Sequence, residues 1–337
     1  MTDLLATWSV PRVSAAAPLP LVLGTMNFGK RTDEAESRRI LDRAFERGVV
    51  HWDTANAYVE GESERIVGRA LQGRRDRVVL ATKVGLRRSG GTGEGLIGAG
   101  GTPEGLSKNR ILAACDESLG RLATDYVDVY YLHAPDQHTP IEESLDAMAT
   151  LVRAGKIRAW ATSNYASWQV LEMLQWCEQN AAPRPLMTQQ LYNLLVRQLD
   201  IEYFAFASRY RLHTAVYNPL AGGLLARANA KASAPAPGSR FDGNTMYQNR
   251  YWTERMHRAT DDYAALAHDL GLSLVELAYA WLASRPGVDS VLVGPGTVRH
   301  LDAAMDGSTR RLDDEAMLRV DGLYGAQQGT NATYARL

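Results

Sequence analysis

From about residue 20 onward, short apolar or β-branched runs alternate along the chain with segments of helical periodicity. Most of the runs are apolar on both faces, which is typical of strands buried in a parallel sheet. Eight strands are predicted, at residues 21–26, 49–53, 78–83, 126–133, 157–162, 187–191, 213–217 and 290–294. Eight strand-then-helix units in a row favour a closed barrel over an open sheet. We therefore predict an α/β fold, a single (β/α)8 TIM barrel.

Start signals mark several of the intervening helices. They are a capping box at Asp33 and Glu36, another at Ser273 and Glu276, and an N-cap at Thr139 followed by Pro140 and Glu142. Two long loops, residues 87–106 and 226–250, follow the third and seventh strands, on the face where a barrel assembles its active site. We expect both to act as lids, the second without regular structure before Tyr251.

One domain is expected over residues 1–337, with an N-terminal extension (1–19), the barrel (20–312) and a C-terminal segment near the barrel mouth (313–337). The chain has 37 basic and 38 acidic residues, so its net charge is 37 − 38 = −1. This balance provides no global field for nucleic acid or an anionic membrane. No run of 18 apolar residues and no signal-peptide pattern is seen, so a cytoplasmic protein is expected.

No cluster of Cys and His suggests a metal site, and two cysteines do not make a disulfide framework. The segment from Gly24 to Arg31 nearly spells a P-loop, but Arg31 stands where a hydroxyl is needed. Gly93, Gly95 and Gly98 match a dinucleotide fingerprint by spacing alone, inside a Gly-rich loop, and are interpreted as loop residues.

Four polar side chains stand at or just beyond three consecutive strand ends. Asp53 ends the second strand, with Tyr58 five positions later; Lys83 ends the third strand and His133 the fourth. Each residue alone also fits a structural ion pair or a capped turn. Because consecutive strands of a barrel are neighbours, we expect the four to converge at the mouth.

These four residue types are suited to protonating a carbonyl oxygen. A phenol is a weak acid near neutral pH, and a nearby ammonium, Lys83, would lower the pKa of Tyr58. Asp53 would compensate the buried Lys83 charge, and His133 would polarise the carbonyl as its oxygen gains charge. The predicted chemistry is therefore proton donation during reduction of a carbonyl carbon.

At these residues the sequence resembles the aldo-keto reductase superfamily. The resemblance rests on Gly24-Thr25, on Asp-Thr-Ala-Asn-Ala-Tyr at 53–58, on Thr82-Lys83 and on Leu-His-Ala-Pro-Asp at 132–136. Within the superfamily, the segments SNYASW, YNPLAGGLL and RFDGNTMYQNRYW resemble the aflatoxin aldehyde reductase subgroup. The resemblance to the superfamily extends from about residue 20 to the end of the chain. It implies a barrel that reduces carbonyls with a nicotinamide cofactor.

The resemblance also implies roles for the matching residues, with Tyr58 as proton donor and Asp53, Lys83 and His133 completing a tetrad. Ser163, Asn164 and Gln189 would hold the nicotinamide amide, Tyr217 would stack on the ring, and Arg240 would clasp the phosphates. The full set of implied cofactor contacts is Gly24, Thr25, Met26, Asp53, Ser163, Asn164, Gln189, Tyr217, Asn218, Pro219, Leu220, Gly222, Arg227, Arg240, Gly294, Gly296, Thr297, Arg299 and His300. Substrate contacts would be Met26, Tyr58, His133 and Arg336. The alternatives are an ordinary turn at Ser163-Asn164, a core role for Tyr217 and a disordered tail at Arg336.

The segment expected at the adenosine departs from the family pattern, with His300 in place of Gln and Ala304 in place of Asn. Arg299 remains to pair with a 2′-phosphate, and Arg227 is the nearest replacement for a family lysine. NADPH is therefore the predicted cofactor and NADH the alternative.

The predicted function is NADPH-dependent reduction of aldehydes, dicarbonyls or ketones by a monomer or homo-oligomer. A biosynthetic ketosugar reductase is one alternative. Another is a cofactor-binding regulatory subunit similar to potassium-channel β subunits.

Overall fold

The computed structural model describes residues 5, 8, 11–12, 14–89, 102–226, 234–330 and 332–335. Eight parallel strands close into a barrel in the order β1-β10-β9-β8-β7-β6-β3-β2, which confirms the predicted (β/α)8 fold. They are β1 (Leu21–Gly24), β2 (His51–Asp53), β3 (Val79–Val84), β6 (Val127–Leu132), β7 (Ile157–Ser163), β8 (Met187–Leu191), β9 (His213–Tyr217) and β10 (Ser290–Val293). The predictions at 187–191 and 213–217 match to the residue.

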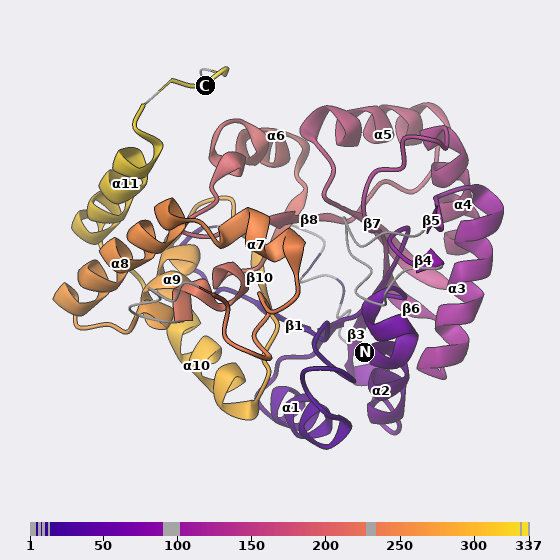
Figure 1. Cartoon of the computed structure of the whole chain (residues 1–337). Coiled ribbons are helices and arrows are strands. Elements are labelled where there is room, and N and C mark those ends of the chain that lie inside the picture. The colour runs from indigo at the N-terminus through magenta and orange to yellow at the C-terminus, as the bar shows by residue number, and fades with distance from the viewer. Residues whose placement is uncertain are drawn as a thin grey trace.

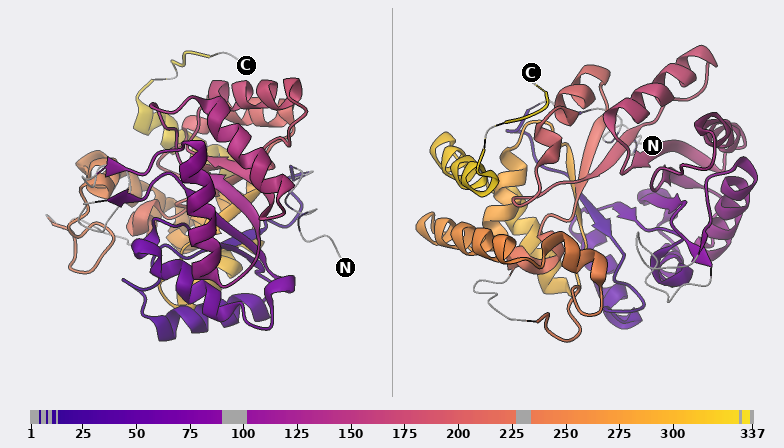
Figure 2. Two further views of the ribbon diagram at one scale, coloured as in Figure 1. Left: turned by 90° about the vertical axis from the view of Figure 1, so that its right-hand side faces the viewer. Right: turned by 45° about the horizontal axis from the view of Figure 1, so that its top comes forward.

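Helices surround the strands, as Figure 1 shows. They are α1 (Glu34–Glu46), α2 (Glu62–Ala70), α3 (Lys108–Leu122), α4 (Ile141–Arg153), α5 (Ser167–Gln179), α6 (Tyr203–Tyr210), α7 (Thr245–Tyr251), α8 (Glu254–Asp269), α9 (Leu274–Ser284), α10 (Val298–Thr309) and α11 (Asp314–Gln328). The C-terminal helix α11 runs beside α8 (Figures 1 and 2). Arg197, in the loop after β8, fixes α11 through an ion pair with Asp321, with 2.6 Å between Nη1 and Oδ1.

Alternating side chains along the strands divide the core into two parts. Inward-facing residues, among them Val79, Ala81, Val129 and Tyr131, form one apolar cluster inside the barrel. Outward-facing residues join the helices in a second, larger cluster. Lys83 continues the inward series of β3, so its side chain belongs to the layer nearest the mouth.

The opposite end of the barrel is covered by Trp8. Its ring lies edge-on to His51, with 4.4 Å between centroids, and 5.7 Å from His213. Arg12 secures this segment, because its backbone N–H donates to Asp289 at 2.6 Å and its guanidinium donates to the Ala283 carbonyl at 3.0 Å. Residues from the N-terminal extension therefore close the end of the barrel away from the strands' carboxyl termini.

The loop after β9 was predicted wrongly as irregular before Tyr251. Helix α7 begins at Thr245, because the Asn244 side chain caps it by accepting from the Tyr247 N–H. Tyr247 and Tyr251, one turn apart, are both buried and anchor this short helix.

Two of the predicted helix starts also differ. The Asp33 side chain caps α1, but Glu36 does not return the contact, since its carboxylate accepts from the Val298 N–H at 2.9 Å. Helix α4 begins after Pro140 without a side-chain cap, and Thr139 donates to Asp136 instead. The capping box at Ser273 and Glu276 is confirmed.

The ends of the Gly-rich loop pair as a short antiparallel ladder, β4 (Arg88–Ser89) with β5 (Thr102–Pro103). Residues 90–101, with the motif Gly93, Gly95 and Gly98, lie outside the described residues, as do Arg227 and Arg336. None of the helices in the part of the chain that the structure describes has both the length and the hydropathy of a membrane span.

Candidate active site

The four residues singled out from strand ends lie together at the barrel mouth. Asp53 ends β2, Lys83 lies in β3, His133 follows β6, and Tyr58 begins a short 3-10 segment (Tyr58–Gly61) after β2. All four side chains are buried, and Asp53, Tyr58 and His133 line one cavity of about 400 Å3. Lys83 lies behind this wall and reaches the site through its contact with Asp53.

Lys83 and Asp53 form an ion pair that is almost completely shielded from solvent, with side-chain exposures of 0% and 1%. The Lys83 Nζ also donates to the Thr54 carbonyl at 2.9 Å, and the Gln189 amide donates to the other Asp53 oxygen at 3.0 Å. Burial favours a raised pKa at Asp53 and a lowered pKa at Lys83, while each charge opposes the shift of the other. Each charged form is therefore stabilised by the other, since water does not reach either side chain to solvate it.

Tyr58 lies between this pair and His133. Its ring centroid is 5.2 Å from the Lys83 Nζ, and its ring meets the His133 ring edge-on with 5.8 Å between centroids. Burial and the Asp53 charge raise the pKa of Tyr58 well above its ordinary value. The net shift is opposite to the lowering expected from Lys83, because burial of the phenol is the largest effect.

The chain turns sharply after Tyr58. Val59, Glu60 and Gly61 have φ values of 49°, 53° and 87°, three left-handed residues in succession. This conformation is strained for a β-branched residue such as Val59, so it persists only where the surroundings hold it. The turn lets helix α2 start at Glu62 while Tyr58 stays directed at the cavity.

His133 is neutral in this setting. Burial and the neighbouring Lys83 charge lower its pKa well below the ordinary value. Its Nδ1 is buried without a hydrogen-bond partner among the described residues. A neutral imidazole offers one N–H donor, so His133 is able to donate to a ligand oxygen without carrying a charge into the cavity.

Most residues implied as cofactor contacts line the same cavity. They are Gly24, Thr25, Met26, Asp53, Ser163, Asn164, Gln189, Tyr217, Asn218, Pro219, Leu220, Gly222, Arg240, Gly294, Gly296 and His300. Thr297 and Arg299 stand at the start of α10 and do not line the cavity; Thr297 caps the helix, and Arg299 is exposed.

Side-chain amides organise the wall formed by β7 and β9. Asn164 donates to the His133 carbonyl at 2.8 Å and accepts from the Tyr217 hydroxyl at 2.6 Å. Asn218 accepts from the Gly222 N–H at 2.7 Å, which folds the glycine turn back toward the strand. Both asparagines have left-handed φ values, near 65°, which asparagine tolerates better than most residues.

The cavity is also lined by residues that sequence reasoning missed. Asn27 accepts from Arg240 at 2.7 Å and donates to the Gly294 carbonyl at 3.2 Å, so it joins the β1 loop to the β10 loop. Tyr247 and Arg250 come from α7, the helix that was not predicted. The Asn244 cap and the pair Tyr247 and Tyr251 at helical spacing were the available signals.

Positive charge dominates the cavity walls. Arg240 and Arg250 line it, and neither forms an ion pair within the part of the chain that the structure describes. Arg250 stands close to Tyr217, whose pKa burial raises to about 12 against the opposing effect of that cation. Asp53 is the one carboxylate among the described lining residues, and Lys83 compensates it. The cavity is thus suited to an anionic ligand.

Among the described residues, no group of three or more His, Cys, Asp or Glu side chains is arranged to hold a metal ion.

Comparisons with known proteins agree with this geometry. A model of the aldo/keto reductase family matches residues 20–325. The chain is 36% identical over 290 residues to human aflatoxin B1 aldehyde reductase member 2. The aligned region covers 83% of this chain and 72% of the human protein. It is 32% identical over 326 residues to the uncharacterized oxidoreductase YrpG of Bacillus subtilis, covering 94% and 95%. It is 34% identical over 275 residues to a probable voltage-gated potassium channel subunit beta of Oryza sativa subsp. japonica, covering 80% of each.

The neutral state of His133 predicts a pH dependence of stability. Below about pH 6.5 the unfolded chain binds a proton at this histidine and the folded chain does not. The free energy of unfolding should therefore fall as the pH drops from 6.5 to 4.5, by about 1.4 kcal/mol per pH unit from this residue. Urea unfolding of His133→Gln should lose that slope, whereas His138→Gln, on the surface, should keep it. Equal slopes in wild type and His133→Gln would show that His133 takes up its proton without unfolding.

Proposed function

The chain belongs to the aldo/keto reductase family and is an oxidoreductase that acts on carbonyl compounds, and on this basis we propose that it reduces aldehydes, dicarbonyls or ketones with NADPH, using Tyr58 as the proton donor. The observation that carries the proposal is the buried Lys83–Asp53 pair behind Tyr58 and His133 at the wall of a cationic cavity.

The residues of the cavity fit a nicotinamide dinucleotide. Arg240 supplies a cation beside Gly294, with 4.0 Å between its Nη2 and the position of a Cβ built on that glycine. The left-handed Gly223 lines the cavity, and no atom lies within 4 Å of the position that its Cβ would take, so the backbone there lets a bulky ligand approach closely. Ser163, Asn164 and Gln189 present polar groups beside the Tyr217 ring, a pattern suited to an aromatic amide. The bound cofactor supplies the hydride for the carbonyl carbon.

His133 and Tyr58 stabilise and then neutralise the negative charge that develops on the carbonyl oxygen. His133 donates its N–H to that oxygen and orients it toward Tyr58. Tyr58 keeps its proton at neutral pH, because its pKa is raised, and releases it only to a strongly basic oxygen. The Lys83 ammonium, 5.2 Å from the ring centroid, stabilises the phenolate as it forms. Asp53 keeps Lys83 charged and in place through this transfer.

The substrate pocket combines apolar and cationic surfaces. Met26, Leu86 and Met246 line the same cavity as Tyr58, and Arg250 adds a cation. We propose that Arg250 contacts a carboxylate or another anionic group on the substrate. Arg336, the implied contact from the C-terminus, lies outside the described residues and remains a proposal from the resemblance alone. A ketosugar reductase is the alternative within the same chemistry, because hydroxyl groups would also find polar partners here.

One relative favours a second function, a cofactor-binding subunit of a channel, because the rice protein is named a probable potassium channel subunit beta. The barrel and the tetrad are compatible with that role. Steady turnover of a carbonyl panel, followed at 340 nm, separates the two functions, since a regulatory subunit binds the cofactor without rapid turnover.

Removing the Tyr58 hydroxyl tests the proton-donor assignment. Tyr58→Phe should lose carbonyl reduction by about 10²-fold or more, because general acid catalysis contributes on that scale, while NADPH still quenches the protein's fluorescence. Tyr126→Phe is the matched control, because Tyr126 lies just before the first residue of β6, at the end of that strand away from His133. This variant should keep both carbonyl reduction and the quenching by NADPH. If Tyr58→Phe still reduced carbonyls at the wild-type rate, Tyr58 would not be the proton donor.

Arg299 tests the choice of cofactor. It is exposed in the first turn of α10 and forms no ion pair with the described residues, so it is available for a 2′-phosphate. Arg299→Ala should weaken NADPH binding about 10-fold, the scale of a charge-assisted hydrogen bond, and leave NADH binding nearly unchanged. Arg310→Ala, just beyond the far end of α10, is the control. Equal weakening of both cofactors would exclude a 2′-phosphate contact.

A further inference from the structure

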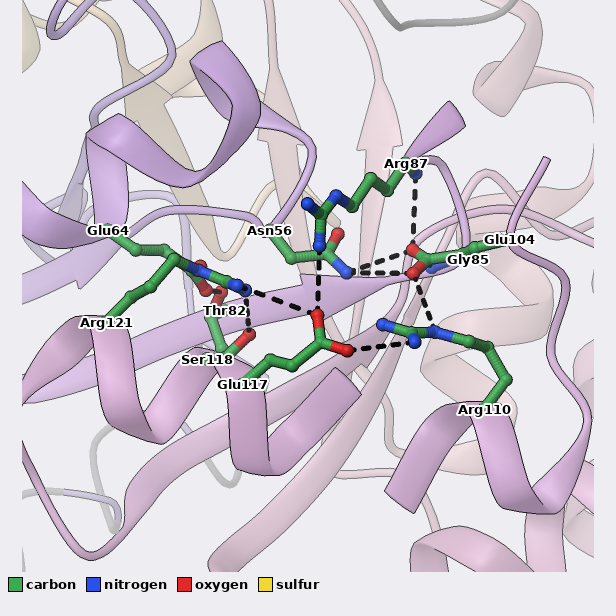
Figure 3. A network of polar contacts seen from close by, with 10 residues as sticks. All are labelled: Asn56, Glu64, Thr82, Gly85, Arg87, Glu104, Arg110, Glu117, Ser118 and Arg121. Carbon is green, nitrogen blue, oxygen red and sulfur yellow. Dashed lines mark hydrogen bonds and ion pairs between the residues drawn. The ribbon is translucent and has the colours of Figure 1, made fainter. Parts of the chain in front are cut away.

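Figure 3 shows a polar network in which Glu104 contacts the segment after β2, the end of β3 and helix α3. Glu104 comes from the segment between β5 and α3. One carboxylate oxygen accepts from the Gly85 N–H at 2.8 Å and from the Arg87 N–H at 3.2 Å. The Asn56 amide donates to both oxygens, at 3.0 and 3.2 Å. Arg110 donates to the second oxygen at 3.1 Å.

These donors make Glu104 a specific connector. Its side chain is only 8% exposed, so its charge depends on them rather than on water. They come from the loop after β2, the end of β3 and helix α3. One buried carboxylate therefore fixes three segments relative to one another.

Asn56 links this connector directly to the catalytic residues. Its backbone N–H donates to the Lys83 carbonyl at 3.2 Å, and it stands two residues before Tyr58. Its side chain is held by Glu104, which also holds Gly85, two residues after Lys83. The backbone that carries Tyr58 and the backbone that carries Lys83 are thus fixed to each other at Asn56.

The network continues from Arg110 along α3. Glu117 accepts from Arg110 at 3.0 Å and lies 3.7 Å from Arg121, which donates to the buried Glu64. Glu64 accepts from Thr82, the residue before Lys83, at 2.6 Å. The Arg121 side chain also lies against Gly61, since a Cβ there would come within 2.6 Å of the Arg121 Cδ. The far end of the left-handed turn after Tyr58 is therefore supported as well.

We propose that Glu104 is a positioning residue, which acts through Asn56 to hold the Tyr58 turn against the Lys83 strand. The inference rests on the proposed role of Tyr58 as the acid. Val59 and Glu60 are strained in their left-handed conformation, so the turn would relax once the link through Asn56 is lost. Loss of Glu104 would change the distance from the Tyr58 hydroxyl to Lys83, and proton donation depends on that distance.

A matched pair of variants separates positioning from stability. Glu104→Gln and Glu117→Gln each remove one carboxylate partner of Arg110 and leave the shape unchanged. Glu104 alone contacts Asn56 and Gly85. In Glu104→Gln, hydrogen–deuterium exchange should accelerate in peptides covering residues 54–64 and 83–87. In Glu117→Gln these peptides should exchange as in wild type, because Arg121 keeps its hydrogen bond to the buried Glu64 and so stays against Gly61.

Kinetics provide the second measurement. Glu104→Gln should lower kcat about 10-fold or more, within the range known for misplaced catalytic groups, and shift the pH profile of kcat. The KM for the carbonyl and the affinity for NADPH should change little. Glu117→Gln should keep the wild-type profile even where its melting temperature falls equally. Asn56→Ala should reproduce the Glu104→Gln pattern, and it serves as the test variant if Glu104→Gln does not fold.

Identical exchange and identical pH profiles in the Glu104 and Glu117 variants would overturn the inference. If the wild-type protein reduces no carbonyl in the panel, the proposed function fails by itself. The exchange measurement then still decides whether Glu104 holds the turn, and unchanged exchange in both Glu104→Gln and Asn56→Ala would contradict it.

Discussion

The geometry of the candidate active site depends on one buried ion pair, Lys83 with Asp53. A full charge at zero exposure needs a partner within contact distance, because water cannot supply one. The barrel provides that partner through register: Asp53 lies opposite Ala81 on the neighbouring strand, and Lys83 follows two residues later on the same face. Each charge thus determines where the other must lie. Since Tyr58 follows Asp53 by five residues, the phenol is carried to the same place.

The rest of the mouth is adapted to that pair. His133 stays neutral because burial, and after it the Lys83 charge, lower its pKa. The strained turn after Tyr58 is tolerated because α2 and α3 pack against it, with Arg121 filling the space left by Gly61. On the outer side, Arg240 and Arg250 face the cavity without carboxylate partners among the described residues. The site therefore keeps its own charges in balance and leaves the surplus positive charge for a ligand.

Much of this arrangement follows from the sequence, because the relevant rules are local or depend on strand order. The alternation of short apolar runs with helical segments predicted all eight strands. The order of neighbouring strand ends predicted the meeting of Asp53, Tyr58, Lys83 and His133. What was missed depends on distant partners. The Glu36 carboxylate accepts from the N–H of Val298, 262 residues away, instead of completing the capping box of its own helix. Glu104 accepts from the Asn56 amide, 48 residues away in the sequence. Helix α7 was missed because the Gly- and Pro-containing stretch before Asn244 obscured the cap and the two buried tyrosines.

The central claim is that Lys83 makes Tyr58 an effective acid, and Lys83→Met tests it most directly. The variant removes the ammonium, and burial then favours the protonated, neutral form of Asp53. NADPH binding, followed by fluorescence quenching, should remain near the wild-type level. Carbonyl reduction at pH 7 should fall by about 10²-fold or more, because the phenolate loses its stabilising charge. A Lys83→Met protein that reduces carbonyls at the wild-type rate, with an unchanged pH profile, would contradict the account.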